Sequence, residues 1–471
     1  MKKRLLGWIA SPLTGLTFGA VCLVYQTVYT MVPVRLAIQG SVLAYLSPAL
    51  AVAGIALLAV TLLTQPRRYW NREMAPCWGI LLALALSTLT NPGSGLTDNV
   101  KTFLWQADIL LPVLGCSREL GEHPSAPARK ALTAAVAVLL LAADAAAAQS
   151  LVMGFRMAYA YVAGRDEVFH QGVHEGRLFG VYITPYVGSR QTALAMVAAV
   201  WLLRRAKGWA KAFAAVSLAL CGAVCVLTGA RAVLLGLMAA AFTVTALWWG
   251  SGHRGGKQRF GLVLLALTAA VGVFAIYTLS DLGLRQVILA VQNDAPQTAA
   301  ETMPAARPST QGNVSSNRFA IWRDYVRILA DRPEKLPFGY SPGGYMAYID
   351  REYPDFFIVQ YFKEHYPVDY AAHGQVYGAH NAALTVAVST GLTGLAAAAW
   401  CAARLLGRVA ALYRQGRLRW EDYAALAAVA IMATAMLFES DVFYVCNPGA
   451  LVFWPLVGYL WGRGKETEER G

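Results

Sequence analysis

Residues 374–400 read GQVYGAHNAALTVAVSTGLTGLAAAAW. From Ala382 onward this stretch is apolar and rich in alanine, which is the composition of a helix that crosses a membrane. His380 and Asn381 stand directly before the apolar part, at the end of a long polar segment. The stretch therefore predicts a transmembrane helix that begins with a histidine at the membrane boundary.

The whole chain of 471 residues is 57% hydrophobic, and its apolar residues come in blocks. Each block is close to the roughly 20 residues that a helix needs to cross a bilayer. The sequence predicts twelve spans, at residues 8–28, 42–63, 76–91, 102–117, 131–153, 182–203, 209–229, 231–249, 260–279, 382–403, 421–438 and 446–462. The expected fold class is an all-α polytopic membrane protein. The first span has no convincing cleavage site, so we expect it to be retained.

The net charge of +13 comes mainly from the connections between the predicted spans. Of the 40 Lys and Arg residues, 24 fall in every second connection and at the two termini. This pattern predicts that both termini are cytoplasmic. Residues 280–380 then form one large extracytoplasmic loop, with nine basic and eleven acidic residues. Because this loop is not a basic patch, the composition argues against nucleic-acid binding.

The predicted organisation has three parts: a nine-helix region at 1–279, a loop domain at 280–381, and a three-helix region with a cytoplasmic tail at 382–471. The loop begins with NDAPQTAAETMPAARPSTQGN, a composition typical of disorder. A surface helix follows, capped by Ser315, Ser316 or Asn317 and stopped by Pro333. Four residues predict its apolar face: Phe319, Trp322, Val326 and Leu329.

Charged side chains also occur inside or at the ends of predicted spans, where each costs roughly 2.5–3.5 kcal/mol on insertion scales. Asp108 and Asp144 lie inside the fourth and fifth spans, and we expect them to be paired or to face a water-filled cleft. Arg190 lies near the outer end of the sixth span. Arg231 stands in a tight outer turn with apolar flanks, which favours a functional role.

One group of polar residues maps to the outer boundary or to the outer loop: Arg231, Arg318, His380, Glu439 and Asp441. Guanidinium groups bind phosphate oxygens in pairs and stay charged. Histidine is the side chain best suited to accept a proton near neutral pH. The group therefore predicts a boundary site for an anionic, lipid-borne substrate.

Four motifs in this order carry a resemblance to a known family: TGARAVLLG at 228–236, NRFAIW at 317–322, PFGYSPGG at 337–344 and HNAALTVAVSTGLTG at 380–394. Together they resemble the O-antigen ligase and O-antigen polymerase superfamily of polytopic bacterial glycosyltransferases. The resemblance covers about 175–460. It implies a GT-C-like helical membrane enzyme that takes a glycan from an undecaprenyl-diphosphate carrier and passes it to an acceptor hydroxyl outside the cytoplasmic membrane. It also implies inversion at the anomeric carbon without a metal or other cofactor.

The resemblance assigns roles to individual residues of this chain. Arg231 and Arg318 would hold the diphosphate, and His380 would activate or orient the acceptor hydroxyl. Asn381 either orients the histidine or caps the following helix. Further candidates are Arg177 in GRLFG, Trp322, Arg190, Glu439 and Asp441.

Three sets of residues leave alternatives open. Glu439 and Asp441 could hold a divalent metal, although capping or pairing with Arg190 or Arg318 is favoured over a metal site. His170 and His174, followed by Glu175, lack a third ligand at convincing spacing for zinc. Many relatives also hold a Pro-Asn pair where this chain has SRQ at 189–191, which leaves the sugar and the acceptor open.

Two other classes of protein compete with a transferase. A transporter or flippase of lipid-linked glycans would also have many spans, but it would be expected to show internal repeats, and none is visible. A structural protein of the envelope would not need the three residues Arg231, Arg318 and His380. Within the transferases, a ligase and a polymerase need the same donor site, and the FESD ending slightly favours a polymerase or a surface-glycan ligase.

Overall fold

The structure of the chain, a computed structural model, describes residues 9–123, 126–163, 168–174, 176–250, 256–293, 317–365 and 378–463. A helix is present at each of the twelve segments that the sequence predicted as spans. They are α2 (Pro12–Tyr29), α4 (Leu46–Thr64), α5 (Ala75–Leu89), α6 (Leu96–Asp108) joined through the π-helical turn η3 (Ile109–Val113) to α7 (Leu114–Glu122), α8 (Ala126–Phe155), α9 (Pro185–Arg205), α10 (Trp209–Leu227), α11 (Arg231–Gly250), α12 (Gly256–Asn293), α17 (Ala382–Arg414), α18 (Trp420–Ala435) and α19 (Pro448–Gly462).

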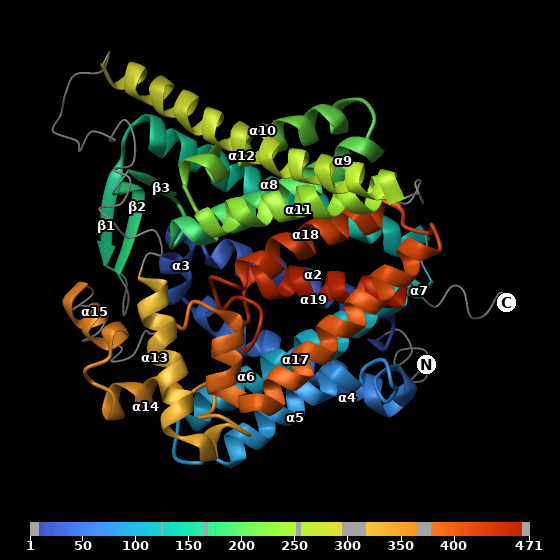
Figure 1. Cartoon of the computed structure of the whole chain (residues 1–471), viewed down its shortest axis with the longest axis vertical. Coiled ribbons are helices and arrows are strands. Elements are labelled where there is room, and N and C mark those ends of the chain that lie inside the picture. The colour runs from blue at the N-terminus through green and yellow to red at the C-terminus, as the bar shows by residue number, and fades with distance from the viewer. Residues whose placement is uncertain are drawn as a thin grey trace.

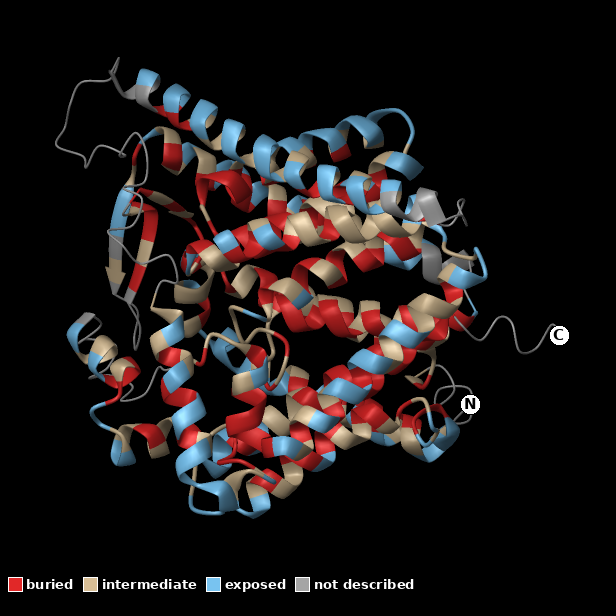
Figure 2. Ribbon diagram, in the orientation of Figure 1, coloured by how far each residue is buried: buried red, intermediate tan, exposed pale blue. Residues whose placement is uncertain are grey.

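Six described segments are long and apolar enough to cross a membrane: Val42–Thr64, Lys130–Phe155, Trp209–Leu227, Arg231–Gly250, Gly261–Ile288 and Ala382–Arg414. Apolar side chains on α12 face outward, and Ile276 and Leu279 are 68% and 69% exposed (Figure 2). Because exposed apolar helices are stable in lipid and not in water, the chain is a mostly helical, polytopic membrane protein. The full count of twelve spans stays a prediction.

A small antiparallel sheet lies at one end of the helix bundle, on the same side of the view as α13–α15 (Figure 1). Its strands are β1 (Tyr159–Ala163), β2 (Val168–His174) and β3 (Arg177–Gly180), in the order β1-β2-β3. Phe169, Val173 and Leu178 are buried on one face of this sheet. An all-α fold was predicted, so the sheet is a departure. Its aromatic and β-branched residues favour strands, and one face packs on the helices.

The described part of the predicted loop domain contains α13 (Arg318–Asp331), the short η4 (Pro333–Lys335), α14 (Tyr345–Glu352) and α15 (Phe357–His365). Of the predicted apolar face of α13, Trp322 and Leu329 are partly buried while Phe319 and Val326 are exposed, and the fully buried side chains are Ile321, Tyr325 and Ile328. The buried set packs with α14, α15 and α17. The stretch predicted to be disordered lies outside the described residues except for Asn293, at which α12 ends.

The short elements around the first helices complete the fold: α3 (Val32–Gln39), η1 (Val42–Tyr45) and η2 (Pro66–Arg68). Met31, which precedes α3, forms a β-bridge with Tyr182, and the backbone N–H of Val32 donates to Val181 O at 2.7 Å. The N-terminal region is therefore joined to the segment between the sheet and α9.

The helix that follows His380 is broken at Gly391, whose φ of 67° and ψ of −161° are not helical. Backbone groups near the break pair with the loop 336–341 instead. Tyr340 N donates to Val388 O at 2.8 Å, and Leu392 N donates to Leu336 O at 2.7 Å. The outer part of α17 is therefore a half-helix of nine residues, 382–390, held by the PFGYSPGG loop.

Close backbone contacts explain the glycines in both motifs. A Cβ on Gly391 would lie 2.4 Å from Leu336 O, and one on Gly339 would lie 2.5 Å from Val388 O. Both glycines also have positive φ, at which other residues are strained. Side chains at the end of α5 hold both segments, because Ser87 Oγ donates to Ser389 O of α17 at 2.6 Å and Asn91 Nδ2, just after α5, donates to Gly339 O of the loop at 3.1 Å. The start of α17 is thereby positioned rigidly against α5.

Candidate functional site

Glu439 joins two of the residues predicted to form the site. Its Oε2 lies 2.8 Å from Nδ1 of His380, and its Oε1 lies 2.6 Å from Nη2 of Arg318. His380 precedes α17, Arg318 begins α13, and Glu439 follows α18, so three distant segments meet here. We call His380, Arg318 and Glu439 the Glu439 cluster. It confirms the predicted pairing of Glu439 with Arg318.

The bond to Glu439 determines which nitrogen of His380 is available for chemistry. A carboxylate only accepts hydrogen bonds, so Nδ1 of the ring carries the proton in this contact. In the neutral ring, Nε2 is then the basic nitrogen. The ring is 36% exposed, whereas Glu439 is 15% exposed. A fixed carboxylate behind a reachable imidazole orients the ring for proton transfer.

The backbone around His380 is unusual and well supported. Its φ is +46°, in the left-handed region that non-glycine residues seldom adopt. The next residues are tied to the segment after α18, because Ala382 N donates to Met436 O at 2.8 Å and Asn381 Nδ2 donates to Leu437 O at 3.1 Å. These contacts hold the histidine in its strained conformation.

Asn381 caps α17, since its Oδ1 accepts from Leu384 N at 3.0 Å. Of its two predicted roles, capping is confirmed and orientation of His380 falls to Glu439 instead. The position of Asn381 before the helix explains why its side chain caps α17 and does not orient His380. The residue just before a helix points its side chain at the free N–H groups of the first turn.

Arg318 and Trp322 surround Phe438, the residue before Glu439. Arg318 Nε donates to Phe438 O at 3.2 Å, and its guanidinium lies 6.0 Å from the centroid of the Phe438 ring. The Trp322 ring lies 6.4 Å from the same ring. Arg318 is 25% exposed, so part of the guanidinium is still accessible. Trp322 therefore packs under the cluster, one helical turn from Arg318.

Asp441 forms a second ion pair, with Nη1 of Arg190 from α9. Arg190 is 1% exposed, and its guanidinium lies 5.5 Å from the centroid of the Tyr186 ring. Glu439 and Asp441 are only two residues apart in the chain, so the two ion pairs are neighbours. Sequence reasoning missed Tyr186. The available signal was its position four residues before Arg190, on the same helical face.

Arg231 is the first residue of α11 and is exposed. Gly236 of α11 packs against the backbone of Ile431 in α18, and these helices run in opposite directions. Arg231 lies five residues before Gly236, and Met436 lies five residues after Ile431. Because the two helices are antiparallel, Arg231 and Met436 lie at the same height, and Arg231 is therefore level with the segment that carries Glu439. Ala230 and Tyr186 also share one apolar cluster.

Arg177 supports the turn before Arg231. Its Nε donates to Thr228 O at 3.1 Å, and its Nη2 donates to Gly229 O at 3.3 Å. These carbonyls end α10, where a guanidinium satisfies acceptors that lack a helical partner. Arg177 therefore connects β3 to the turn and helps to set the position of Arg231.

Other predicted polar residues lie apart from this site. Asp144 accepts from Ser217 Oγ at 2.5 Å, which confirms its structural pairing. Asp108 was expected to be paired or to face a water-filled cleft; neither of its carboxylate oxygens has a hydrogen-bond partner among the described residues, and it faces Gly54. His170 and His174 stack with ring centroids 4.2 Å apart on β2, whereas Glu175 lies outside the described residues.

Within the part of the chain that the structure describes, no three His, Cys, Asp or Glu side chains are grouped as in a metal site. Glu439 and Asp441 instead each contact a basic group. All seven cysteines are free, and six of them are buried, where a free cysteine packs as a small apolar side chain.

Helices of membrane-spanning length, with a histidine, two carboxylates and several arginines gathered at one end, define a polytopic membrane protein with a polar site at one end of its helices. Residues 216–399 match the model of a protein family described as O-antigen ligase. This match supports the O-antigen ligase superfamily that the motifs predicted and, in this broad sense, a glycan-transferring membrane enzyme. Comparisons with curated proteins and with solved structures found no match.

The matched region bears directly on the site. It includes Arg231, Arg318 and His380, but it ends before Glu439 and Asp441. The family implies lipid-linked glycans and membrane lipids as partners. The carboxylates that hold the basic residues in place are therefore supplied by the chain beyond the matched region.

Proposed function

We propose that this protein transfers a glycan from an undecaprenyl-diphosphate-linked donor to an acceptor hydroxyl at the outer face of the cytoplasmic membrane. The observation that carries the proposal is the contact of one carboxylate, Glu439, with both His380 and Arg318. This contact puts a proton acceptor and a permanent cation next to each other, as the chemistry of a glycosyl diphosphate requires.

In the proposed reaction the acceptor oxygen attacks the anomeric carbon of the donor sugar. The bond from that carbon to the diphosphate oxygen breaks, and undecaprenyl diphosphate leaves with the electron pair. The proton of the acceptor hydroxyl passes to Nε2 of His380, whose Nδ1–H stays bonded to Glu439. A single displacement of this kind inverts the anomeric carbon.

The arginines are proposed to stabilise the leaving group. Arg318 and Arg231 would bind the diphosphate oxygens, because a guanidinium offers paired donors and a charge that does not titrate. Stabilising charge that develops during bond breaking lowers the barrier most effectively when the donors are already in place. Arg318 meets this condition through its bonds to Glu439 and Phe438 O, and Arg231 through the turn that Arg177 supports.

Arg190 and Asp441 are proposed to brace the site without touching the reacting atoms. Arg190 is almost fully buried and is neutralised by Asp441, so it fixes the segment between Glu439 and α19. Asp441 also accepts from Asn447 Nδ2 at 3.3 Å, and Asn447 caps α19. The proposed reaction uses no metal ion.

The test uses the purified full-length protein in detergent with lipid-linked oligosaccharide extracted from its own host, in the presence of EDTA. Release of undecaprenyl diphosphate is measured for the wild type, for His380→Ala and for the control His170→Ala, which removes a histidine outside the Glu439 cluster. We expect release by the wild type and by the control only. Equal release by His380→Ala would overturn the role of the histidine.

The products separate the remaining alternatives. A glycan of two or more repeats on the carrier identifies a polymerase, and transfer to another acceptor identifies a ligase. If the folded wild type leaves the donor intact with every acceptor supplied, the transferase proposal fails and a flippase of lipid-linked glycans takes its place.

A further inference from the structure

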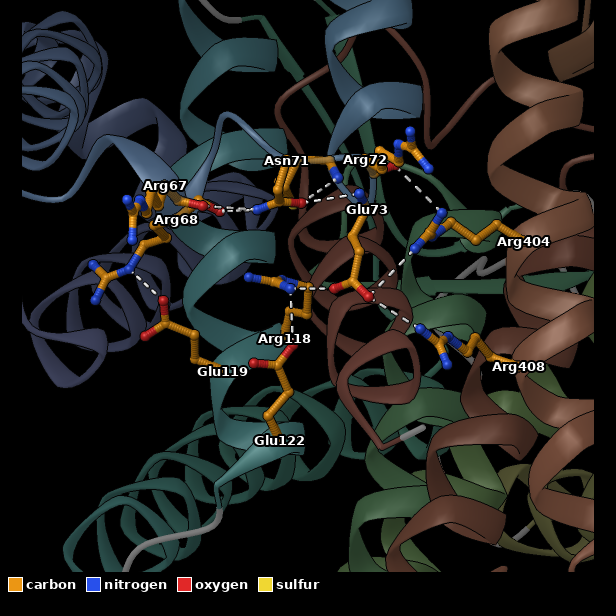
Figure 3. Close-up of polar contacts among 11 residues, drawn as sticks. Arg67, Arg68, Asn71, Arg72, Glu73, Arg118, Glu119, Glu122, Arg404 and Arg408 are labelled. Atoms are coloured by element: carbon orange, nitrogen blue, oxygen red, sulfur yellow. Dashed lines mark hydrogen bonds and ion pairs between the residues drawn. The ribbon is translucent and has the colours of Figure 1, made fainter. Parts of the chain in front are cut away.

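A second cluster of charged residues lies at the far end of α17 from His380. Glu73, in the connection between α4 and α5, forms ion pairs with three arginines (Figure 3). Arg118 of α7 contacts it through Nη1, Nη2 of Arg408 lies 3.0 Å from its carboxylate, and Nη2 of Arg404 lies 3.6 Å from it. We call Glu73, Arg118, Arg404 and Arg408 the Glu73 cluster. The proposed transfer reaction uses none of these residues.

The Glu73 cluster holds more positive than negative charge. Arg118 also pairs with Glu122 at 2.8 Å, and the exposed Arg72 stands beside the cluster, where its carbonyl accepts from Arg404 Nη1 at 3.4 Å. Three guanidinium groups, those of Arg118, Arg404 and Arg408, thus face two carboxylates, and the exposed guanidinium of Arg72 adds a further positive charge nearby. Arg118 is 4% exposed, and its Nε is buried without a hydrogen-bond partner among the described residues. Two positive charges are left for an anion to balance.

The surroundings of the cluster favour a lipid over a soluble anion. Trp400, Arg404 and Arg408 follow each other at intervals of four on α17, so they form one stripe, and Trp400 is 49% exposed. Near Arg72, Trp70 is 64% exposed and stacks on Trp78 with ring centroids 4.5 Å apart. Exposed tryptophans next to arginines are typical of the depth at which acyl chains meet headgroups.

We propose that Arg72, Arg404 and Arg408 bind the phosphodiester headgroup of an anionic phospholipid, in the leaflet opposite the proposed transfer site. One acyl chain would lie along Trp400. Arg404 and Arg408 each give Glu73 only part of their donors, so both can also donate to a phosphate oxygen. In the predicted orientation this is the cytoplasmic leaflet, whose surface is anionic. The site is independent of the transfer chemistry.

The experiment measures lipid binding to the full-length protein by native mass spectrometry in neutral detergent. The probes are dioleoylphosphatidylglycerol, dioleoylphosphatidylcholine and inorganic phosphate. We expect selective binding of phosphatidylglycerol, since each arginine near a membrane surface contributes about fivefold in affinity for an anionic lipid. Equal binding of phosphatidylcholine would overturn the proposal. Inorganic phosphate that displaces the lipid at equal concentration would make it a site for soluble anions instead.

Matched variants locate the site. Arg404→Gln with Arg408→Gln should weaken phosphatidylglycerol binding about 25-fold, as expected for two such arginines. Arg414→Gln, an exposed arginine at the end of the same helix, should change it less than twofold. Arg72→Gln leaves every ion pair of Glu73 intact and should weaken binding about fivefold. An effect of Arg414→Gln as large as that of the double variant would contradict a local site.

Glu73→Gln separates a lipid site from a purely structural cluster. Removing the carboxylate frees Arg404 and Arg408, so phosphatidylglycerol should bind more tightly if the arginines form the site. A structural role alone predicts no tightening. Weaker binding by a variant that stays folded would overturn the proposal.

Discussion

Two carboxylates, Glu439 and Glu73, organise opposite ends of the same helix in different ways. Glu439 holds one arginine and one histidine, and these side chains are 25% and 36% exposed. Glu73 holds three arginines, which are between 4% and 22% exposed. The histidine stands on strained backbone, with φ of +46°, whereas Arg404 and Arg408 belong to regular helix.

The side chains around each carboxylate distinguish a catalytic site from a site that binds an anion or has a structural role. Arginine stays charged, so a cluster of arginines around a carboxylate can attract an anion but cannot carry a proton. Histidine changes its charge near neutral pH, and strained backbone is retained where the surroundings hold it. Only the Glu439 cluster combines a titratable ring, partial exposure and strain.

The largest expected effect comes from removing the ring that distinguishes the two clusters. His380→Asn should lower the rate of glycan transfer by about 10²–10⁴-fold, which is the usual contribution of a positioned base. Asparagine tolerates positive φ and its amide can still donate to Glu439, so the fold should persist. The measurement is release of undecaprenyl diphosphate together with thermal unfolding. Unchanged release at equal stability would remove His380 from the mechanism.

Gly391→Ala should disrupt the packing of the break in α17 against the loop 336–341. A Cβ at this position would meet Leu336 O, Phe338 N and Pro337 C within 2.5 Å, and a residue with positive φ costs about 1–3 kcal/mol in addition. We expect a clear fall in the thermal unfolding temperature. Gly407→Ala is the control, because nothing lies within 4 Å of a Cβ added there. Equal stability of the two variants would show that the break at Gly391 is not required.

Exchanging each carboxylate for an amide compares the two clusters directly. Glu439→Gln should reduce transfer about 10–100-fold, the usual effect of losing the partner that orients a functional histidine. Glu73→Gln should leave transfer unchanged and lower stability, since Arg118 loses a buried partner. The two activities, measured at saturating donor, are the test. An equal loss of activity in both variants would mean that the clusters do not differ in function.

The smallest expected effect concerns Asp324, which supports the outer helices next to the Glu439 cluster. Its Oδ2 accepts from Ile358 N at 3.3 Å, and burial raises the pKa of this carboxyl. A raised pKa in the folded state means that stability is fullest below the unfolded pKa and is lost as the pH rises through the folded pKa. Asp324→Asn should abolish this pH dependence.

Hydrogen exchange of the α15 amides between pH 4 and 7, corrected for intrinsic rates, measures that effect. The wild type should lose protection as the pH rises, while the variant keeps it. The same pH dependence in both proteins would assign the effect to another group. Transfer activity should change little, because Asp324 touches neither His380 nor Arg318.

The sequence predicted those features that depend on a local pattern, such as an apolar block or a short motif. Apolar blocks predicted helices at all twelve segments, and the motifs around Arg231, Arg318 and His380 predicted the family. These features depend on local composition and spacing. The pairing of Glu439 with Arg318 could also be anticipated, since both residues map to one membrane boundary.

Contacts between distant segments could not be predicted in the same way. The bond between His380 and Glu439 joins residues 59 positions apart, and it depends on how α17 and α18 pack. Apolar residues lie on more than one side of α13, and packing against α15 and α17 decides that Ile321, Tyr325 and Ile328 are the fully buried ones. The sheet at 159–180 was missed because its strands are too short to show a clear alternation.

The break at Gly391 has a consequence for the order of membrane insertion. The loop 336–341 leaves the ribosome before α17, and its pairing partners at 388–393 follow about 50 residues later. In the predicted orientation the loop has therefore already crossed the membrane when the half-helix arrives. The backbone partners that complete the hydrogen bonds at the break are therefore synthesised before the half-helix that needs them.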